Sequence, residues 1–148
     1  MIICIEWGLV AHYLSLNHSD VYKVGVQKNE KDIHHLTDEN LSVEIKGSSN
    51  KKHIFGNRSY AQPSSGNGQK NKNGYYITIN FEQFSEANKN PDILIIRFGY
   101  LDHSDWIPQA SATGQQARLG TDVYKYKLKT LYPEPKKELV SPSLFPFD

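Results

Sequence analysis

Three residues in the first third of the chain have the types and spacing for chemistry on a phosphate group. Asp32 is followed a dozen residues later by Glu44 and Lys46. Carboxylate oxygens are the ligands that hard divalent cations prefer, and a bound Mg²⁺ keeps several waters and can contact a substrate phosphate directly. Such a metal lowers the pKa of a bound water, and a lysine beside it stabilises the charge that develops on the phosphate. The pattern predicts a metal-assisted phosphodiester site, with an exposed strand face carrying Glu and Lys as the alternative.

The residues around Glu44 predict the element that positions it. Leu41 to Ser48 alternates with the two-residue period of a half-buried strand, so that Val43 and Ile45 face one way while Glu44 and Lys46 face the other.

A hairpin with the preceding segment, residues 32–36, would bring Asp32 to the same face. A three-residue loop, 38–40, suits this hairpin because Asn40 tolerates the left-handed conformation of the last loop position. The register that follows predicts three cross-strand pairs: Thr37 with Leu41, His34 with Glu44, and Asp32 with Lys46. A slip of one residue would turn the acids to opposite faces.

Asp32 followed by Glu44-Ile45-Lys46 resembles the metal-binding core of the PD-(D/E)xK nuclease superfamily. Gly47-Ser48 follows, as is common there, whereas Lys31 stands where that superfamily usually has proline. Residues 75–81 and 96–119 are similar to segments of ScaI-type restriction endonucleases, and the whole resemblance spans roughly residues 6–119. The resemblance implies an α/β (α+β) fold with a restriction-endonuclease-like core, in which helices flank a mixed central sheet.

The same resemblance implies roles for individual residues. Asp32 and Glu44 would bind Mg²⁺, for which Mn²⁺ would substitute, Lys46 would be catalytic, and Glu6 of the first helix would be an auxiliary acid. The substrate would be double-stranded DNA, cut within a restriction-modification system, and two chains would form a homodimer to cut both strands. Two alternatives stay open: an inactive nuclease-like module that binds DNA or protein, and a related nuclease such as a toxin that acts on RNA.

Two groups of residues are candidates for contact with DNA. Residues 45–81 contain six cations and no acid, although the net charge of the whole chain is only +1; such asymmetry favours a polyanion partner. A second group has amides that can pair with an adenine edge, on what we expect to be a short Ala-rich helix. The candidates are Lys51, Lys52, Arg58, Lys70, Gln109, Gln115, Gln116 and Arg118, and a solvated loop with unremarkable glutamines is the alternative.

The remaining pattern predicts the order of the elements. A first helix is expected over residues 2–16, a strand over 20–26 that joins the hairpin in an antiparallel meander, and a mobile basic flap over 48–74. Strands follow over 75–81 and 92–98, the latter a central strand covered on both faces, and a last strand or short helix over 124–131. His103 is expected to be a hydrogen-bonded structural group and Trp106 a core residue. The nuclease-like domain would span residues 1–131 and a Pro-rich tail 132–148.

Composition places the chain in a broad class. At 148 residues it is long enough for one domain with one core. Cys4 is the only cysteine, which excludes an intrachain disulfide and favours a reducing compartment. No apolar run reaches membrane-spanning length, and the N-terminal segment lacks the features of a signal peptide. We therefore expect a cytoplasmic protein without a membrane partner.

Overall fold

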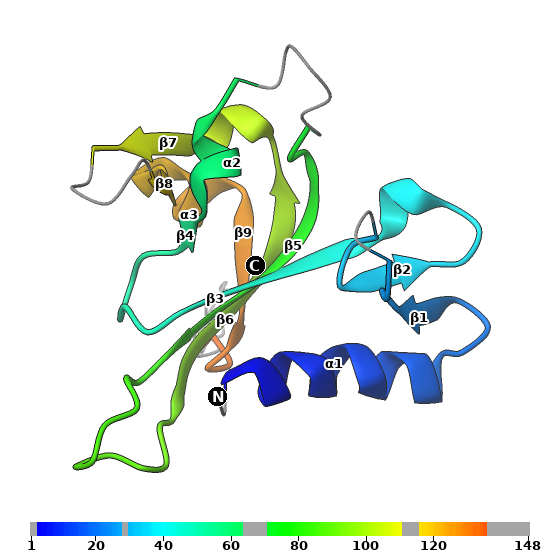
Figure 1. Ribbon diagram of the computed structural model, residues 1–148, viewed down its shortest axis with the longest axis horizontal. Coiled ribbons are helices and arrows are strands. Elements are labelled where there is room, and N and C mark those ends of the chain that lie inside the picture. Colours follow the sequence, from blue (N-terminus) through cyan, green and yellow to red (C-terminus); the bar gives the residue numbers. More distant parts are fainter. Residues whose placement is uncertain (1–2, 28–29, 64–70, 111–115, 136–148) are drawn as a thin grey trace, which may run out of the picture.

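The computed structural model describes residues 3–27, 30–63, 71–110 and 116–135, with the side chains of residues 3–9 outside that description. The described part is a mixed α+β fold, as predicted, built on two sheets (Figure 1). None of its helices is long and apolar enough to cross a membrane.

The larger sheet, sheet A, has six strands in the order β1-β2-β3-β5-β6-β9. Its strands are β1 (Tyr22–Val24), β2 (Ile33–His35), β3 (Val43–Ser48), β5 (Gly74–Phe81), β6 (Ile93–Leu101) and β9 (Leu128–Tyr132). All neighbours are antiparallel except β3 and β5, which run parallel, so the sheet is mixed. The predicted meander of the first three strands is confirmed. The strand predicted over 92–98 is β6, which extends to Leu101 and lies in the interior of the sheet between β5 and β9. The prediction that it is covered on both faces is wrong, because most of its residues are only half-buried.

The smaller sheet, sheet B, has the order β4-β8-β7 and lies at the upper left in Figure 1 with two short helices. The strands of sheet B are β4 (Phe55–Gly56), β7 (Trp106–Gln109) and β8 (Gln116–Leu119). The two helices are α2 (Arg58–Ala61) and α3 (Thr121–Tyr126). The segment predicted over 124–131 is thus the end of a helix followed by a strand.

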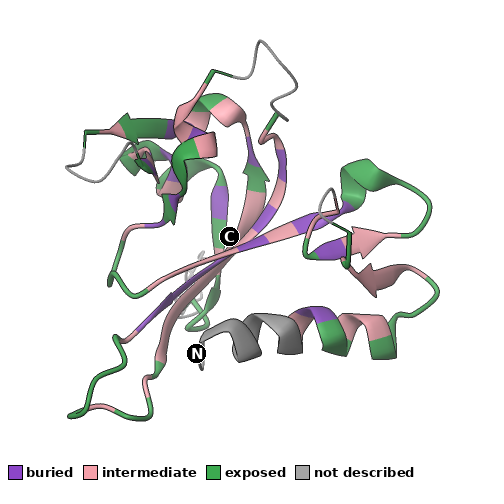
Figure 2. Ribbon diagram, in the orientation of Figure 1, coloured by how far each residue is buried: buried purple, intermediate pink, exposed green. Residues whose placement is uncertain are grey.

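The first helix, α1 (Ile3–Asn17), packs on one face of sheet A. Its sequence predicts an apolar stripe that includes Tyr13 and Leu16, and this part of the prediction is wrong because both side chains are exposed. Val10, Ala11 and Leu14 lie in a cluster with Val43 and Ile45. Sheet B covers the opposite face, with Tyr76 of β5 and Leu128 of β9 in its cluster. The buried residues in Figure 2 accordingly follow the strands of sheet A between these two layers.

Gly99 lies where two strands of sheet A approach each other closely. It lies opposite Leu128 in the β6–β9 pair, and a Cβ at this position would sit 2.0 Å from the carbonyl oxygen of Lys127. Backbone cannot move aside as a flexible side chain can. We therefore expect Gly99→Ala to lower the free energy of unfolding by about 3 kcal/mol, measured by urea denaturation.

Gly120 provides the matched control. A Cβ there would come closest to the end of the Ile107 side chain, at 3.3 Å, and would meet Val123 Cγ2 and the Asp105 carbonyl oxygen at ordinary contact distances of 3.7 and 3.9 Å. Gly120→Ala should cost less than about 1 kcal/mol. Equal stabilities of the two variants would contradict this account of Gly99.

Candidate active site

The β2–β3 hairpin brings Asp32 and Glu44 to the same face of sheet A. Ile33 pairs with Val43, which places Asp32 directly opposite Glu44. The predicted register, with Asp32 opposite Lys46 and His34 opposite Glu44, is wrong by two residues. A shift of two keeps every side chain on its face, so the predicted sharing of one face is confirmed.

The connection between the two strands explains the shift. Residues 39–41 form a 3-10 helix, where Asp38 accepts a hydrogen bond from the Asn40 N–H (3.0 Å). Asn40 therefore lies within this helix, and the predicted left-handed loop position is absent from the hairpin. Buried Ser42 accepts a hydrogen bond from the backbone of His35 (2.9 Å), which fixes the second end of the connection.

Glu44 receives two donors on one oxygen. Lys46 Nζ lies 3.0 Å from Glu44 Oε1 in a half-buried ion pair. The hydroxyl group of Tyr60, from α2, donates to the same Oε1 at 3.4 Å. Because both donors contact Oε1, the other carboxylate oxygen, Oε2, has no hydrogen bond among the described residues.

Asp32 is held in a similar way from the backbone. Its Oδ2 accepts the N–H of Ile45 at 2.8 Å, so the carboxyl group lies against β3 although the residue as a whole is exposed. Burial of this group and the negative charge of Glu44 raise the pKa of Asp32, while the Ile45 N–H and the charge of Lys46 act in the opposite direction. A carboxylate whose ionisation is opposed by a neighbouring carboxylate is stabilised by a cation bound beside it.

A cleft of about 310 Å³ opens beside Glu44. Lys31, Tyr60, Lys72 and Tyr76 are among its lining residues. Lys31 Nζ donates to the carbonyl oxygen of Asn73 (3.2 Å), and burial lowers the pKa of this lysine, with Glu44 partly offsetting the effect. Glu30 and Glu39 also line it, so the cleft combines acids with cations and aromatic rings.

The donor set fits a hard cation such as Mg²⁺. Asp32 and Glu44 each keep one oxygen free of hydrogen bonds within the described residues, and Mg²⁺ takes one or two protein carboxylates with waters completing its coordination. The described residues contain no cluster of three or more His, Cys, Asp or Glu side chains, so a third protein ligand is not seen there.

Glu6 lies on α1, and its side chain is outside the described residues. The described part of this helix packs on the Val43 and Ile45 face of sheet A, opposite the face that carries Glu44. The auxiliary role of Glu6 therefore stays a prediction.

The predicted mobile flap at 48–74 is wrong for most of its length. After β3 the chain turns at Asn50, whose Oδ1 accepts the backbone N–H groups of Lys52 and His53. It then forms β4 and α2, and both Ile54 and Tyr60 are buried in the cluster under sheet B. The candidates Lys51, Lys52 and Arg58 are exposed on this folded segment, whereas Lys70 lies outside the described residues.

The predicted Ala-rich helix at 109–118 is also wrong. Its described ends are strands β7 and β8, an antiparallel ribbon in which Gln109 pairs with Gln116. Gln116 is exposed and Arg118 half-buried on the outer face, whereas Ala117 faces the core, and Gln115 lies outside the described residues.

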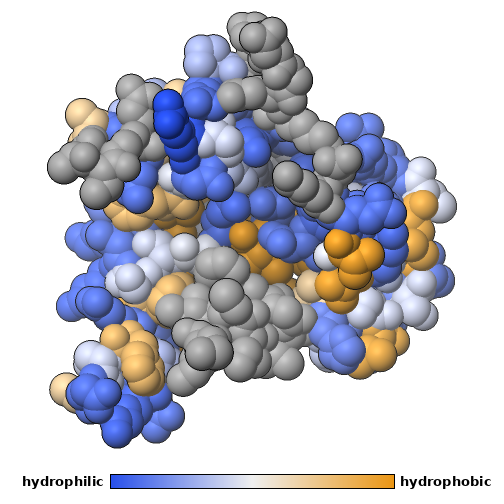
Figure 3. Space-filling view, viewed as in Figure 1, coloured by the Kyte–Doolittle hydropathy of each residue, from blue (hydrophilic) through white to orange (hydrophobic). Residues whose placement is uncertain are grey.

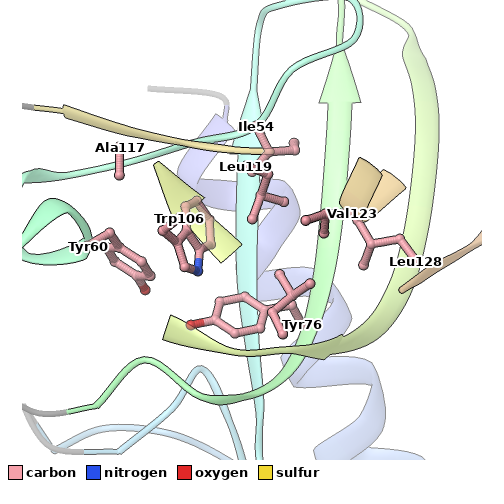
Figure 4. Packing of buried hydrophobic residues seen from close by; sticks show 9 residues of the cluster. Ile54, Tyr60, Tyr76, Trp106, Ala117, Leu119, Val123 and Leu128 are labelled. Carbon is pink, nitrogen blue, oxygen red and sulfur yellow. The ribbon is translucent and has the colours of Figure 1, made fainter. Parts of the chain in front are cut away.

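His103 and Trp106 have the structural roles predicted for them. His103 Nε2 lies 2.6 Å from the carbonyl oxygen of Gln62, and its Nδ1 accepts the N–H of Lys72 (3.2 Å). Trp106 is buried between the rings of Tyr60 and Tyr76, at 4.6 and 5.8 Å between centroids. Figure 4 shows these three rings together, with the hydroxyl ends of the tyrosines pointing toward each other.

The sequence pattern does not indicate three residues of the cleft, Tyr60, Tyr76 and Lys31. Tyr60 comes from a four-residue helix whose position depends on the packing of sheet B. Lys31 adjoins Asp32, and the absence of the usual proline there was the only available signal.

A mixed sheet with helices, on which Asp32, Glu44 and Lys46 share one face, is consistent with a restriction-endonuclease-like protein. The sequence matches the ScaI restriction endonuclease family over residues 3–132. It is 41% identical over 117 residues to the type II restriction enzyme ScaI of Streptomyces caespitosus, an alignment that covers 78% of this chain and 52% of that enzyme. The chain belongs to the ScaI restriction endonuclease family.

The chain spans about half the length of this curated relative. No solved structure matches the chain.

Proposed function

We propose that the chain is a metal-dependent endodeoxyribonuclease that hydrolyses phosphodiester bonds of double-stranded DNA, as a type II restriction endonuclease does. The observation that carries the proposal is the meeting of Asp32, Glu44 and Lys46 on one face beside a cleft, in a member of this family.

In this proposal Asp32 and Glu44 hold Mg²⁺, and Mn²⁺ substitutes for it. The bound metal would activate a water and offset charge on the scissile phosphate. Lys46, whose ammonium group already lies beside Glu44, stabilises the negative charge that develops on the phosphate.

The DNA-binding surface is proposed to combine the segment around β4 and α2 with the β7–β8 ribbon of the smaller sheet. Lys51, Lys52 and Arg58 would contact phosphates, because exposed cations bind the backbone regardless of sequence. The β7–β8 ribbon would present Gln109 and Gln116 to base edges, since the major groove admits a two-stranded ribbon. Most of the described surface in Figure 3 is hydrophilic, which suits a polar ligand.

A homodimer is proposed because each active site cuts one DNA strand. The two strands of a palindromic target are related by two-fold symmetry, so two chains related by the same symmetry would cut both strands. Sedimentation of the protein with and without duplex DNA measures this state.

The test of the proposed function is cleavage of a supercoiled plasmid with Mg²⁺. Wild-type protein should convert the plasmid to linear fragments, and Lys46→Ala should cut about a hundredfold more slowly, because one stabilising group at the phosphate is lost. Lys89→Ala is the control, since Lys89 is exposed and its ion pair is with the exposed Glu86.

The other outcomes distinguish the alternatives. Retention of DNA in a gel without cleavage by any variant would support the inactive binding module. Degradation of RNA but not of plasmid would support a nuclease of the toxin type. Discrete bands as opposed to a smear would separate a sequence-specific enzyme from a nonspecific one.

A further inference from the structure

Glu44 is held on one oxygen by two donors of different character. Lys46 belongs to the same strand and reaches Oε1 through a long flexible chain, at 3.0 Å. Tyr60 reaches the same oxygen at 3.4 Å through a rigid ring that comes from α2. The ring has only two rotatable side-chain bonds, so it constrains the carboxylate more than a lysine can.

The position of Tyr60 is fixed from several sides. The ring is 4% exposed and packs edge-on against Trp106, with centroids 4.6 Å apart. Gly56 lies so close that a Cβ there would sit 2.7 Å from Tyr60 Cγ. The Asn57 side chain caps the helix that carries Tyr60, and its Oδ1 accepts the Ser59 N–H at 3.1 Å.

Two ammonium groups also lie over this ring. Lys46 Nζ is 4.9 Å and Lys72 Nζ is 4.7 Å from its centroid, within the range of cation–π attraction. Tyr60 therefore contacts both the acid and the catalytic lysine of the proposed site.

We propose that Tyr60 is a positioning residue for the metal site, one that holds Glu44 by Oε1 so that Oε2 is presented to the metal. The inference rests on the proposed function. It also gives the smaller sheet a role at the metal, because Tyr60 belongs to the layer that carries the candidate DNA-binding residues.

The chemistry of the hydroxyl group supports this role. A phenolic hydroxyl group ordinarily ionises only near pH 10, so the Tyr60 hydroxyl group is protonated at neutral pH and donates toward the carboxylate. Without it, Glu44 would be restrained on Oε1 by Lys46 alone and could rotate to place both oxygens on that ammonium group. Loss of such an outer-shell partner typically weakens metal binding by about tenfold or more.

The experiment is calorimetric titration of the metal-free protein with Mn²⁺, for wild type, Tyr60→Phe and Tyr100→Phe. Tyr60→Phe should bind Mn²⁺ about tenfold more weakly. Phenylalanine keeps the ring between Gly56 and Trp106, so the thermal midpoint without metal should change little. Tyr100 lines the same cleft but is 46% exposed, and Tyr100→Phe should bind as wild type does.

Cleavage provides a second readout. If Tyr60 acts through metal binding, saturating Mn²⁺ should return the rate of Tyr60→Phe to near that of wild type. Wild-type Mn²⁺ affinity in Tyr60→Phe, with or without a lowered thermal midpoint, would overturn the inference. Glu44→Gln distinguishes failure of the Tyr60 inference from failure of the proposed metal site. If Glu44 binds the metal, Glu44→Gln should weaken Mn²⁺ binding whatever Tyr60 does. Unchanged Mn²⁺ binding by Glu44→Gln would instead show that the metal site itself is wrong.

Discussion

Asp32→Asn is expected to abolish cleavage while raising the stability of the metal-free protein. Asparagine can keep the hydrogen bond from the Ile45 N–H but offers the metal no charge. Loss of several kcal/mol of metal-based stabilisation corresponds to a fall in rate of about a thousandfold or more.

The gain in stability follows from the direction of the pKa shift. The folded protein raises the pKa of Asp32 above its unfolded value, because burial and Glu44 disfavour the charged form. Ionisation of Asp32 therefore costs folding free energy at neutral pH, and that cost disappears as the pH falls through the raised folded pKa toward the unfolded one. Asparagine removes the cost at neutral pH, so the thermal midpoint without metal should rise.

The measurement combines plasmid cleavage with thermal unfolding at several pH values. The stability difference between Asp32→Asn and wild type should shrink in acid. Asp38→Asn is the control, since Asp38 is exposed, accepts the Asn40 N–H and is not one of the proposed metal ligands. Cleavage at the wild-type rate by Asp32→Asn would refute the assigned metal ligand.

Trp106→Ala is expected to have the largest effect on stability. The side chain is 3% exposed and fills the space between Tyr60 and Tyr76, so its removal leaves a large cavity under sheet B. The cost should be about 3–5 kcal/mol, a large part of the stability of a typical domain. Urea denaturation followed by circular dichroism measures it.

Two further variants separate packing from polarity at this position. The buried indole Nε1 of Trp106 has no hydrogen-bond partner among the described residues, so Trp106→Phe loses no such bond and should cost less than about 1.5 kcal/mol. Ile107→Ala, at the exposed neighbouring position, should change stability by less than about 0.5 kcal/mol. A similar loss for Trp106→Phe and Trp106→Ala would contradict the cavity explanation.

The face of the site could be predicted from the sequence, but its register could not. Alternation of Val43 and Ile45 with Glu44 and Lys46 decides which side chains meet the core, because burial of the wrong face would be costly. The register depends instead on the 3-10 helix at 39–41 and on the hydrogen bond to Ser42, which no periodicity reveals.

The two larger errors have different physical reasons. The sequence of 48–74 predicts a mobile segment because its apolar residues are few and irregularly spaced, yet Ile54 and Tyr60 suffice to anchor it once sheet B covers them. The helix expected near residue 116 was based on alanine content. The alternation of Gln116, Ala117, Arg118 and Leu119 already indicated a strand, and burial of Ala117 and Leu119 made it one.

The imidazole ring of His103 contacts the carbonyl oxygen of Gln62 with one nitrogen and the backbone N–H of Lys72 with the other. One side chain therefore holds together the two ends of the segment between Gln62 and Lys72. Changes in the length of a segment closed in this way add only a small entropic cost, and they need not move β5 or the acids beside it.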